Sequence, residues 1–315
     1  MARWYGRFDR KTCDQSIELL RKAINRTKLG IGESVMEPLS IIAISAAVGG
    51  VAGKFADKAW DLGEKWLSSY FKDHAPKARE EAEQNSLDFL SELAQRVKML
   101  EQQGEQNKKL IEDSLNHPDF SVLLQKAIIS SAQTDDKQKH ELLARLVSDR
   151  LTKGSESLFA LSSKLACDAV PMLNVRQVKI LGLLTTLFFV RPRPFPPQIP
   201  KEEFSIWFTQ WLTQRLHVYQ DLTLNNMDLL HLESLSCIRV SIGSRDLQKI
   251  LAPSQESGVV FDYKAFSETE AGKKVNELWE SELKHSLPTT IGQVIGTYTL
   301  DMLTNTTTSF DGWGE

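Results

Sequence analysis

The sequence predicts a mainly α-helical protein, and three features of its pattern support this fold class. Apolar residues recur at three- and four-residue steps through most of the 315 residues, which is the period of one helix face. Proline and glycine interrupt this pattern at intervals that suit helix ends. Only 237–242 and 258–263 are rich in β-prone residues, and we expect them to pair as one small hairpin.

The totals are those of a globular protein without an overall charge preference. Hydrophobic residues make up 41% of the chain, charged residues 25%, and the formal net charge is -3. Any contact with nucleic acid or anionic lipid therefore needs a local patch. The three cysteines are far apart in the sequence, which fits a reducing compartment rather than a disulfide framework or a cysteine-based zinc site.

The first 72 residues are expected to hold two segments. Residues 1–35 form a basic N-terminal extension with one helix over 11–28, and Met36 offers an alternative start. The extension is too long and polar for the start of a signal peptide, which predicts a cytoplasmic protein. Residues 36–72 are expected to form an apolar, membrane-competent helix of small residues that continues into an amphipathic helix rich in tryptophan.

The apolar run SIIAISAAVGGVAGKF (40–55) is uncharged until Lys54. As a helix it spans about 24 Å, which is short of the roughly 30 Å hydrocarbon core of a bilayer. Glycine costs about 1 kcal/mol in a helix interior, and close helix packing is one reason to accept that cost. The predicted membrane or oligomer packing face consists of Ser45, Ala46, Gly49, Gly50 and Gly53, and the predicted membrane-interface aromatics are Trp60, Trp66 and Tyr70.

Three interpretations of this run stay open on the residues alone. It is the buried central helix of a soluble bundle, a single conventional membrane anchor, or a segment that inserts conditionally when several copies assemble around the small-residue face.

The rest of the chain divides into a helical bundle and a C-terminal module. Residues 73–189 are expected to form a bundle that includes a short coiled-coil-like segment and a helical hairpin. The stretch 190–200 holds five of the eleven prolines, which predicts an extended connection. Residues 201–303 hold the small hairpin and the closing helices, and 304–315 is expected to be a disordered tail. The coiled-coil-like seam consists of Leu90, Leu93, Val97 and Leu100.

The sequence holds none of the common catalytic or metal-binding motifs. A P-loop, G-x-G-x-x-G, H-E-x-x-H and G-x-S-x-G are all absent, and the six histidines are scattered singly. His140 lies near a helix start and is explained by a surface or capping role. Asp135 and Asp136 are explained as acids at a helix N-terminus. We therefore predict that the protein is not an enzyme and uses no metal or cofactor.

Two stretches of the chain resemble a family of uncharacterised bacterial proteins encoded beside defence genes. They are MEPLSIIAISAAVGGVAGKFADKAWDLGEKWLSSYFKDHAPKA (36–78) and DFSVLLQKAIISSAQTDDKQKHELLARLVSDRL (119–151). The second stretch is also similar to abortive-infection alpha proteins, together with HLESLSCIRVSI (231–242) and FSETEAGKKVNELW (266–279). In those proteins a helical hairpin with an acidic turn precedes a winged-helix-like region, so the resemblance implies a winged-helix-like α+β module over 201–303.

A small-residue N-terminal helix on a helical body also resembles the channel-forming effector of Hailong-type antiphage systems. This resemblance implies a homo-oligomer, with a tetramer favoured, that contacts membrane lipid at the cytoplasmic face of the inner membrane. It also implies a channel held closed by a short single-stranded DNA that a partner nucleotidyltransferase makes.

The residues offered for such an oligonucleotide lie after the bundle. They are Arg191, Arg193, Arg239, Arg245 and Lys249, with Trp207, Phe208 or Trp211 as stacking faces. An alternative stays open, in which the aromatic residues belong to the core and the cations are merely solvated. The expected recognition helix, 222–235, carries Asp228 and Glu233 and no Lys or Arg, so entry into a duplex groove is not expected.

These observations favour a self-associating effector of antiphage defence that acts at the bacterial inner membrane as a ligand-gated channel or pore. A soluble helical adaptor or regulator with a winged-helix-like module is the alternative.

Overall fold

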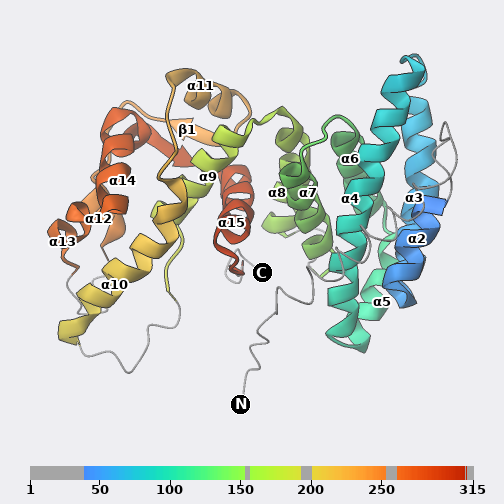
Figure 1. The fold of residues 1–315 in the computed structure, drawn as a ribbon, viewed down its shortest axis with the longest axis horizontal. Helices are drawn as coiled ribbons and strands as arrows, with labels where there is room; N and C mark the ends of the chain where they lie inside the picture. Colours follow the sequence, from blue (N-terminus) through green and yellow to red (C-terminus); the bar gives the residue numbers. More distant parts are fainter. Residues whose placement is uncertain (1–38, 153–156, 193–200, 253–260, 309, 311–315) are drawn as a thin grey trace, which may run out of the picture.

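The computed structural model describes residues 39–152, 157–192, 201–252, 261–308 and 310 (Figure 1). These residues are mainly helical and include one sheet of two short strands. The predicted mainly α-helical class is therefore confirmed. The extension 1–35 lies outside the described residues, as does most of the proline-rich connection, 193–200.

All of the described secondary structure in the first half of the chain is helical. Its helices are α2 (Leu39–Val48), α3 (Gly50–Tyr70), α4 (Pro76–Gln102), α5 (Glu105–Ser114), α6 (Pro118–Ala132), α7 (Lys137–Arg150) and α8 (Leu158–Ala169). Helix ends follow local chemistry. Pro76 and Pro118 stand in the first turns of α4 and α6, and Asp136 caps α7 by accepting a hydrogen bond from the Gln138 amide. The capping role predicted for Asp136 is thus confirmed.

The second half contains the sheet and the remaining helices. Its elements are α9 (Val175–Phe188), α10 (Lys201–Leu216), α11 (Asn226–Ser234), β1 (Ile238–Val240), α12 (Leu247–Leu251), α13 (Tyr263–Glu268), α14 (Glu270–Ser281), β2 (Ser286–Pro288) and α15 (Thr290–Thr304), with 3-10 turns at Val170–Met172, His217–Tyr219 and Leu283–His285. Asn174 forms a capping box with Gln177 at the start of α9.

The long helix α4 lies at the centre of the first half and packs against α3, α6 and α7. Leu90, Leu93 and Val97 are fully buried in this bundle, and Leu100 is partly buried against it. The seam predicted from these residues therefore serves the core of a single chain. It leaves no coiled-coil surface for a second copy.

The two strands pair antiparallel, with Ile238 opposite Pro288 and Val240 opposite Ser286. The predicted pairing of 237–242 with 258–263 is wrong, because residues 261 and 262 are not in a strand and Tyr263 begins α13. The partner strand follows α14 in the sequence, and a strand of three residues gives no local signal that identifies it.

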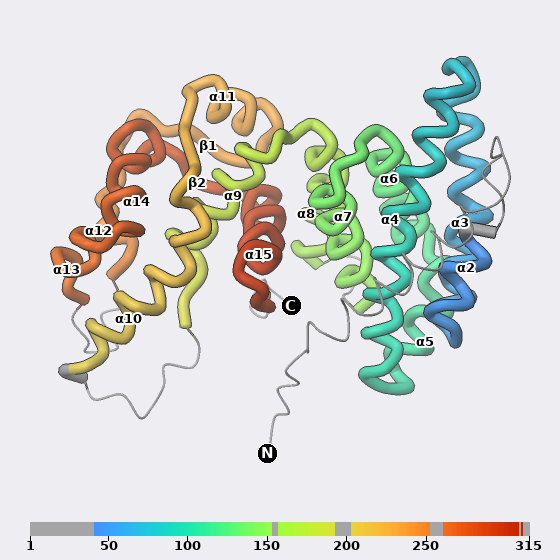
Figure 2. Tube along the Cα trace, viewed as in Figure 1, coloured from blue at the N-terminus to red at the C-terminus, as the bar shows by residue number. Residues whose placement is uncertain are grey.

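Helix α15 lies between the two halves (Figure 2) and packs against α9 on one side and α8 on the other. Glycine permits the close crossing with α9. A Cβ on Gly296 would lie 2.3 Å from the Leu181 carbonyl oxygen, and a Cβ on Gly182 would lie 3.1 Å from Thr299 Cγ2. The two helices therefore approach almost backbone to backbone.

Part of the predicted disordered tail is held against α15. The Asp301 carboxylate accepts hydrogen bonds from the amide and hydroxyl of Thr308 at 2.9 and 2.8 Å, and from the Thr306 hydroxyl at 3.0 Å. The Phe310 ring lies 5.0 Å from that of Phe159 and 5.4 Å from that of Tyr298. The prediction of disorder is thus wrong for 304–308 and 310, because a buried carboxylate and an aromatic cluster bind this segment.

Candidate functional site

The helix predicted over 36–72 is broken at two glycines. Gly49 and Gly50 have φ values of 59° and 63°, in the left-handed region that glycine adopts without strain. Helix α2 consequently folds back along α3, and Ile41 and Ile44 pack against Ala56. The expectation of one continuous helix through this region is wrong.

The predicted packing residues serve this fold-back rather than one straight face. A Cβ on Gly53 would lie 2.7 Å from the Ser45 carbonyl oxygen, so the missing side chain lets α2 approach α3. The Ser45 hydroxyl also donates a hydrogen bond to the Asp57 carboxylate. Ala46 points outward and is exposed. Four of the five predicted residues (Ser45, Gly49, Gly50 and Gly53) thus lie at the turn or in its closest contact.

A carboxylate from the end of the next helix, α4, caps the N-terminus of α3. Glu101, at the end of α4, accepts hydrogen bonds from the amides of Val51 and Ala52 at 3.2 and 3.3 Å, and Lys98 Nζ lies 3.2 Å from the same carboxylate. Glu101 is only 8% exposed. Burial acts to raise its pKa, but the hydrogen bonds from the two amides and Lys98 outweigh burial and hold the pKa below its usual range.

A shallow hollow of about 300 Å³ lies beside this cap. It is lined by Lys98, Glu101, Gln102, Gly104, Glu105 and Lys108. Two lysines face two glutamates there, so the hollow has no excess charge to select an anion or a cation.

The outer surface of α2 is apolar. Ile42 is 58% exposed, and Ala43, Ala46 and Ala47 are exposed on the same side. Among the predicted interface aromatics, Trp60 and Trp66 are half-buried against the core, whereas Tyr70 is exposed. In the part of the chain that the structure describes, no helix has both the length and the hydropathy needed to cross a bilayer.

The residues predicted to bind an oligonucleotide divide into three groups. Arg191 is half-buried and donates hydrogen bonds to the carbonyls of Leu187 and Ile250, which tie the end of α9 to α12. Burial lowers its pKa to about 10. The expectation that Arg191 is exposed and free to bind phosphate is therefore wrong, and Arg193 lies outside the described residues.

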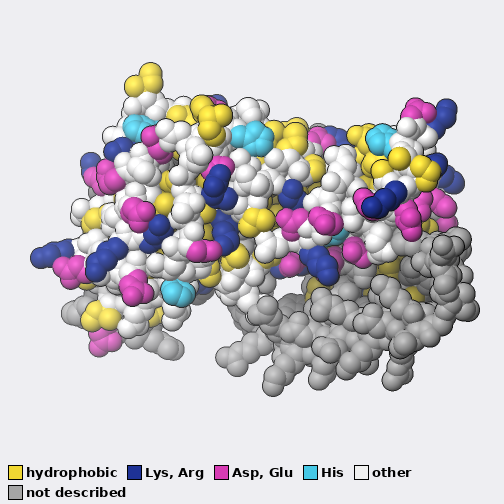
Figure 3. Space-filling model, turned by 45° about the horizontal axis from the view of Figure 1, so that its top comes forward, with side chains coloured by type: hydrophobic (Ala, Val, Ile, Leu, Met, Phe, Trp, Pro, Cys, Tyr) yellow, Lys and Arg dark blue, Asp and Glu magenta, His cyan; other side chains and the backbone are white. Residues whose placement is uncertain are grey.

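Three cations remain near β1. Arg239 and Lys249 are exposed, while Arg245 is half-buried and donates a hydrogen bond to the Ser241 hydroxyl at 3.2 Å. Lys249 Nζ lies 3.9 Å from the Asp246 carboxylate. Over the face shown in Figure 3, Lys and Arg side chains alternate with Asp and Glu rather than forming a patch of one sign.

The proposed stacking residues belong mostly to the core. Phe208 is buried and stacks on Trp211 with ring centroids 5.7 Å apart, and the Arg215 guanidinium lies 4.0 Å above the Trp211 ring. Trp207 is partly buried. Asp228 of α11 is buried and forms an ion pair with Arg176 Nε at 2.7 Å. Its charge thus fixes α11 to α9, which explains an acidic residue in that helix.

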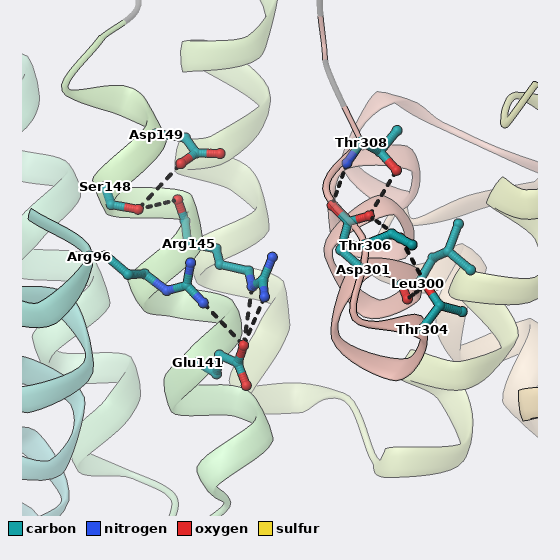
Figure 4. Close-up of polar contacts among 10 residues, drawn as sticks. All are labelled: Arg96, Glu141, Arg145, Ser148, Asp149, Leu300, Asp301, Thr304, Thr306 and Thr308. Carbon is teal, nitrogen blue, oxygen red and sulfur yellow. Dashed lines mark hydrogen bonds and ion pairs between the residues drawn. The ribbon is translucent and has the colours of Figure 1, made fainter. Parts of the chain in front are cut away.

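A partly buried cluster of charges that sequence reasoning missed joins the two halves. Figure 4 shows Arg96 of α4 and Arg145 of α7 both directed at Glu141, with nitrogen–oxygen distances of 3.0 and 2.9 Å. One turn further along α7, Asp149 accepts a hydrogen bond of 2.6 Å from the Tyr298 hydroxyl of α15. The sequence held one sign of this cluster. Arg96 stands beside the apolar positions of α4, where a solvent-exposed side chain is not expected.

Burial shifts the pKa of two members of this cluster, Arg96 and Tyr298. It lowers the pKa of Arg96, with the nearby charge of Arg145 acting in the same direction, and it raises the pKa of Tyr298 well above the usual value, with Asp149 adding to the effect. No group of three or more His, Cys, Asp or Glu side chains in the described ranges is arranged to hold a metal ion. The chemistry that this cluster offers is charge pairing between helices.

Comparison with known proteins gives a family and no individual relative. No curated protein and no solved structure matches the chain. A model of an uncharacterised protein family matches residues 53–280. This range begins in α3 and ends in α14, so that α2 and α15 lie outside it. Because the match covers more than half of the chain, the protein belongs to that family.

Proposed function

We propose that the protein is a self-associating effector of bacterial antiphage defence that acts at the inner membrane as a ligand-gated channel or pore. The observation that carries the proposal is α2, a ten-residue helix without a charged or strongly polar side chain whose outer side exposes Ile42, Ala43, Ala46 and Ala47. The resemblance to abortive-infection alpha proteins and to the Hailong-type effector gives the proposal its biological setting.

The size of α2 limits how it can act. Ten residues of helix rise about 15 Å, or half of the hydrocarbon core. A single copy therefore contacts a bilayer at its surface, and crossing requires a longer helix that includes α2. Small residues on its surface allow several such helices to approach closely.

A surface for self-association lies on α8. Leu158, Leu161 and Leu165 are exposed at the spacing of a coiled-coil seam. Three leucines that line one exposed side of a helix favour contact with another apolar surface. We propose this stripe as the contact between subunits, in place of the buried seam on α4, with a tetramer as the assembly.

The restraining ligand is proposed to bind at β1 and α12, in a winged-helix-like module. Arg239 and Lys249 are exposed there and Arg245 lies between them in the sequence. These cations suit the phosphates of a short single-stranded DNA. Glu233, which accepts a hydrogen bond from the Val240 amide at 2.8 Å, and Asp246 lie on the neighbouring elements and oppose phosphate binding. We therefore expect weak affinity from a single subunit and stronger binding from an assembly.

The membrane role is tested with vesicles of phosphatidylethanolamine and phosphatidylglycerol that contain a fluorescent dye. The protein should float with the vesicles and release the dye, and Ile42→Asp should abolish both effects because a charge on α2 opposes burial in lipid. Ile206→Asp is the matched control, because Ile206 is 64% exposed on α10, away from α2. Equal leakage by the wild-type and Ile42→Asp proteins contradicts the role of α2. A protein that never floats favours the soluble adaptor.

The ligand site is tested by fluorescence anisotropy with a short single-stranded DNA. Affinity should fall steeply with salt, and the triple variant Arg239→Ala, Arg245→Ala, Lys249→Ala should bind all sequences more weakly. Lys77→Ala serves as a control, since this exposed lysine lies on α4 in the other half. Binding that does not depend on salt places the contact elsewhere.

A further inference from the structure

We infer that α2 and α3 form a hinge with two stable arrangements, a folded one latched by Glu101 and a straight one in which residues 39–70 are a single helix. What the straight arrangement does at a membrane rests on the proposed function. The hinge itself follows from hydrogen bonding and glycine geometry.

The first argument concerns the two amides that Glu101 binds. In the folded arrangement the Val51 and Ala52 amides donate to the Glu101 carboxylate. In a continuous helix each amide donates to the carbonyl four residues earlier, so the same two groups would bind Ala47 and Val48. Both arrangements satisfy these donors. A buried amide is therefore not left without an acceptor when the carboxylate is exchanged for helix carbonyls.

The second argument is that the change needed is confined to two residues. The Gly49 amide already donates to the Ser45 carbonyl, and the Gly53 amide donates to the Gly49 carbonyl, each at 2.8 Å. Both bonds have the spacing of an α-helix. The helical pattern is thus present on each side of the turn, and rotation of the Gly49 and Gly50 backbone joins its two parts.

The third argument is that every glycine in the turn favours the folded arrangement and none is required by the straight one. Gly49 and Gly50 have positive φ, a Cβ on Gly50 would lie 2.5 Å from Glu101 Oε1, and a Cβ on Gly53 would lie 2.7 Å from the Ser45 carbonyl oxygen. In a straight helix alanine is more favourable than glycine at all three positions.

The folded arrangement covers little apolar surface of α2. Ile41 and Ile44 are buried against Ala56, Leu87 and Ala94, whereas the opposite side of α2 is exposed. Straightening exposes these two isoleucines, so the straight arrangement needs an apolar surface that receives them. A bilayer or the α2 of another copy supplies such a surface, and the uncharged part of the helix then continues through Gly53.

The hinge is tested by disulfide trapping in the full chain with Cys13→Ser, Ser45→Cys and Asp57→Cys. The side chains of Ser45 and Asp57 are in contact in the folded arrangement, but twelve residues of straight helix separate them by about 18 Å, beyond the reach of a disulfide. The bond should form readily in this parent protein. Glu101→Gln should slow its formation severalfold, because one carboxylate oxygen and the negative charge are lost.

Glycine variants provide an independent comparison. Gly49→Ala should shift the equilibrium about tenfold toward the straight arrangement, because the folded arrangement needs a positive φ at this residue and alanine disfavours it. No described atom lies within 4 Å of a Cβ at this position, so a clash in the folded arrangement does not explain the effect. Gly63→Ala is the control, because Gly63 lies within α3 and a Cβ there meets only the side chain of Ile128.

Trapping at the parent rate in both Glu101→Gln and Gly49→Ala overturns the hinge. Dye release by the same proteins is measured separately, before and after reduction of the disulfide. A hinge that opens in solution without any dye release contradicts the proposed function and leaves the hinge in place. Equal dye release by the oxidised and reduced parent shows that the hinge does not control the membrane step.

Discussion

Replacing Gly296 with alanine should destabilise the fold, because α9 leaves no room for a methyl group. The added Cβ would lie 2.1 Å from Thr185 Oγ1, 2.3 Å from the Leu181 carbonyl oxygen and 2.8 Å from the Leu181 carbonyl carbon. Two of these atoms belong to the backbone of α9, so no side-chain rotation relieves the contact. The helices must move apart across a packed core.

The magnitude follows from two opposing effects. Overpacking of a core costs about 1–3 kcal/mol, and contacts this short with backbone atoms belong at the upper end. Alanine returns about 1 kcal/mol through its higher helix propensity. The free energy of unfolding should therefore fall by about 2 kcal/mol, which lowers Tm by roughly 5 °C in a chain of this size.

Thermal and urea unfolding followed by circular dichroism at 222 nm measure this change. Gly182→Ala is the matched control in the same helix pair. Its Cβ would meet the Tyr219 hydroxyl at 2.7 Å and the Thr299 side chain, which can shift, so its loss of stability should be smaller. A Gly296→Ala protein that unfolds at the wild-type midpoint, or one more stable than Gly182→Ala, refutes the packing argument.

Three further predictions concern buried polar groups. Tyr298→Phe removes the hydroxyl that binds Asp149 at 2.6 Å and should lower the free energy of unfolding in urea by about 1.5–3 kcal/mol, as for other hydrogen bonds to charged groups; an unchanged midpoint contradicts this. Burial raises the pKa of the Cys237 thiol to about 12, so Ellman's reagent should label it only as fast as the protein opens. Burial raises the pKa of Asp301 above its usual 3.8, so the folded state binds the carboxyl proton more tightly than the unfolded state does. The free energy of unfolding should therefore fall as the pH rises above 3.8. The Asp301→Asn protein should lack this fall. If its free energy of unfolding differs from that of the wild-type protein by a constant amount from pH 4 to 6, the prediction for Asp301 is wrong.

The helices and several caps could be predicted because their signals are local. The apolar period located the helices of the bundle, and Asp136 was recognised as a cap. These features depend on residues within one or two turns of each other.

The hinge and the helix crossing were not predictable in the same way. Gly49 and Gly53 match a pattern for helix packing, yet the turn between α2 and α3 depends on Glu101, some 50 residues away. The spacing that does serve close packing, Gly292 and Gly296, lies in α15. Arg191 likewise looked exposed in a proline-rich stretch, and its hydrogen bond to the carbonyl of Ile250, 59 residues away, could not be predicted from local sequence.

The position of α15 has a consequence for how the protein is made. Its partners α8 and α9 are synthesised more than a hundred residues earlier, and both must wait with an uncovered face until this helix emerges from the ribosome. The Tyr298–Asp149 bond across the two halves forms last as well. A chain that stops before Thr290 lacks the helix that joins them and exposes apolar surface to chaperones and proteases. The contact between the two halves therefore depends on a helix that is made after both of its partners.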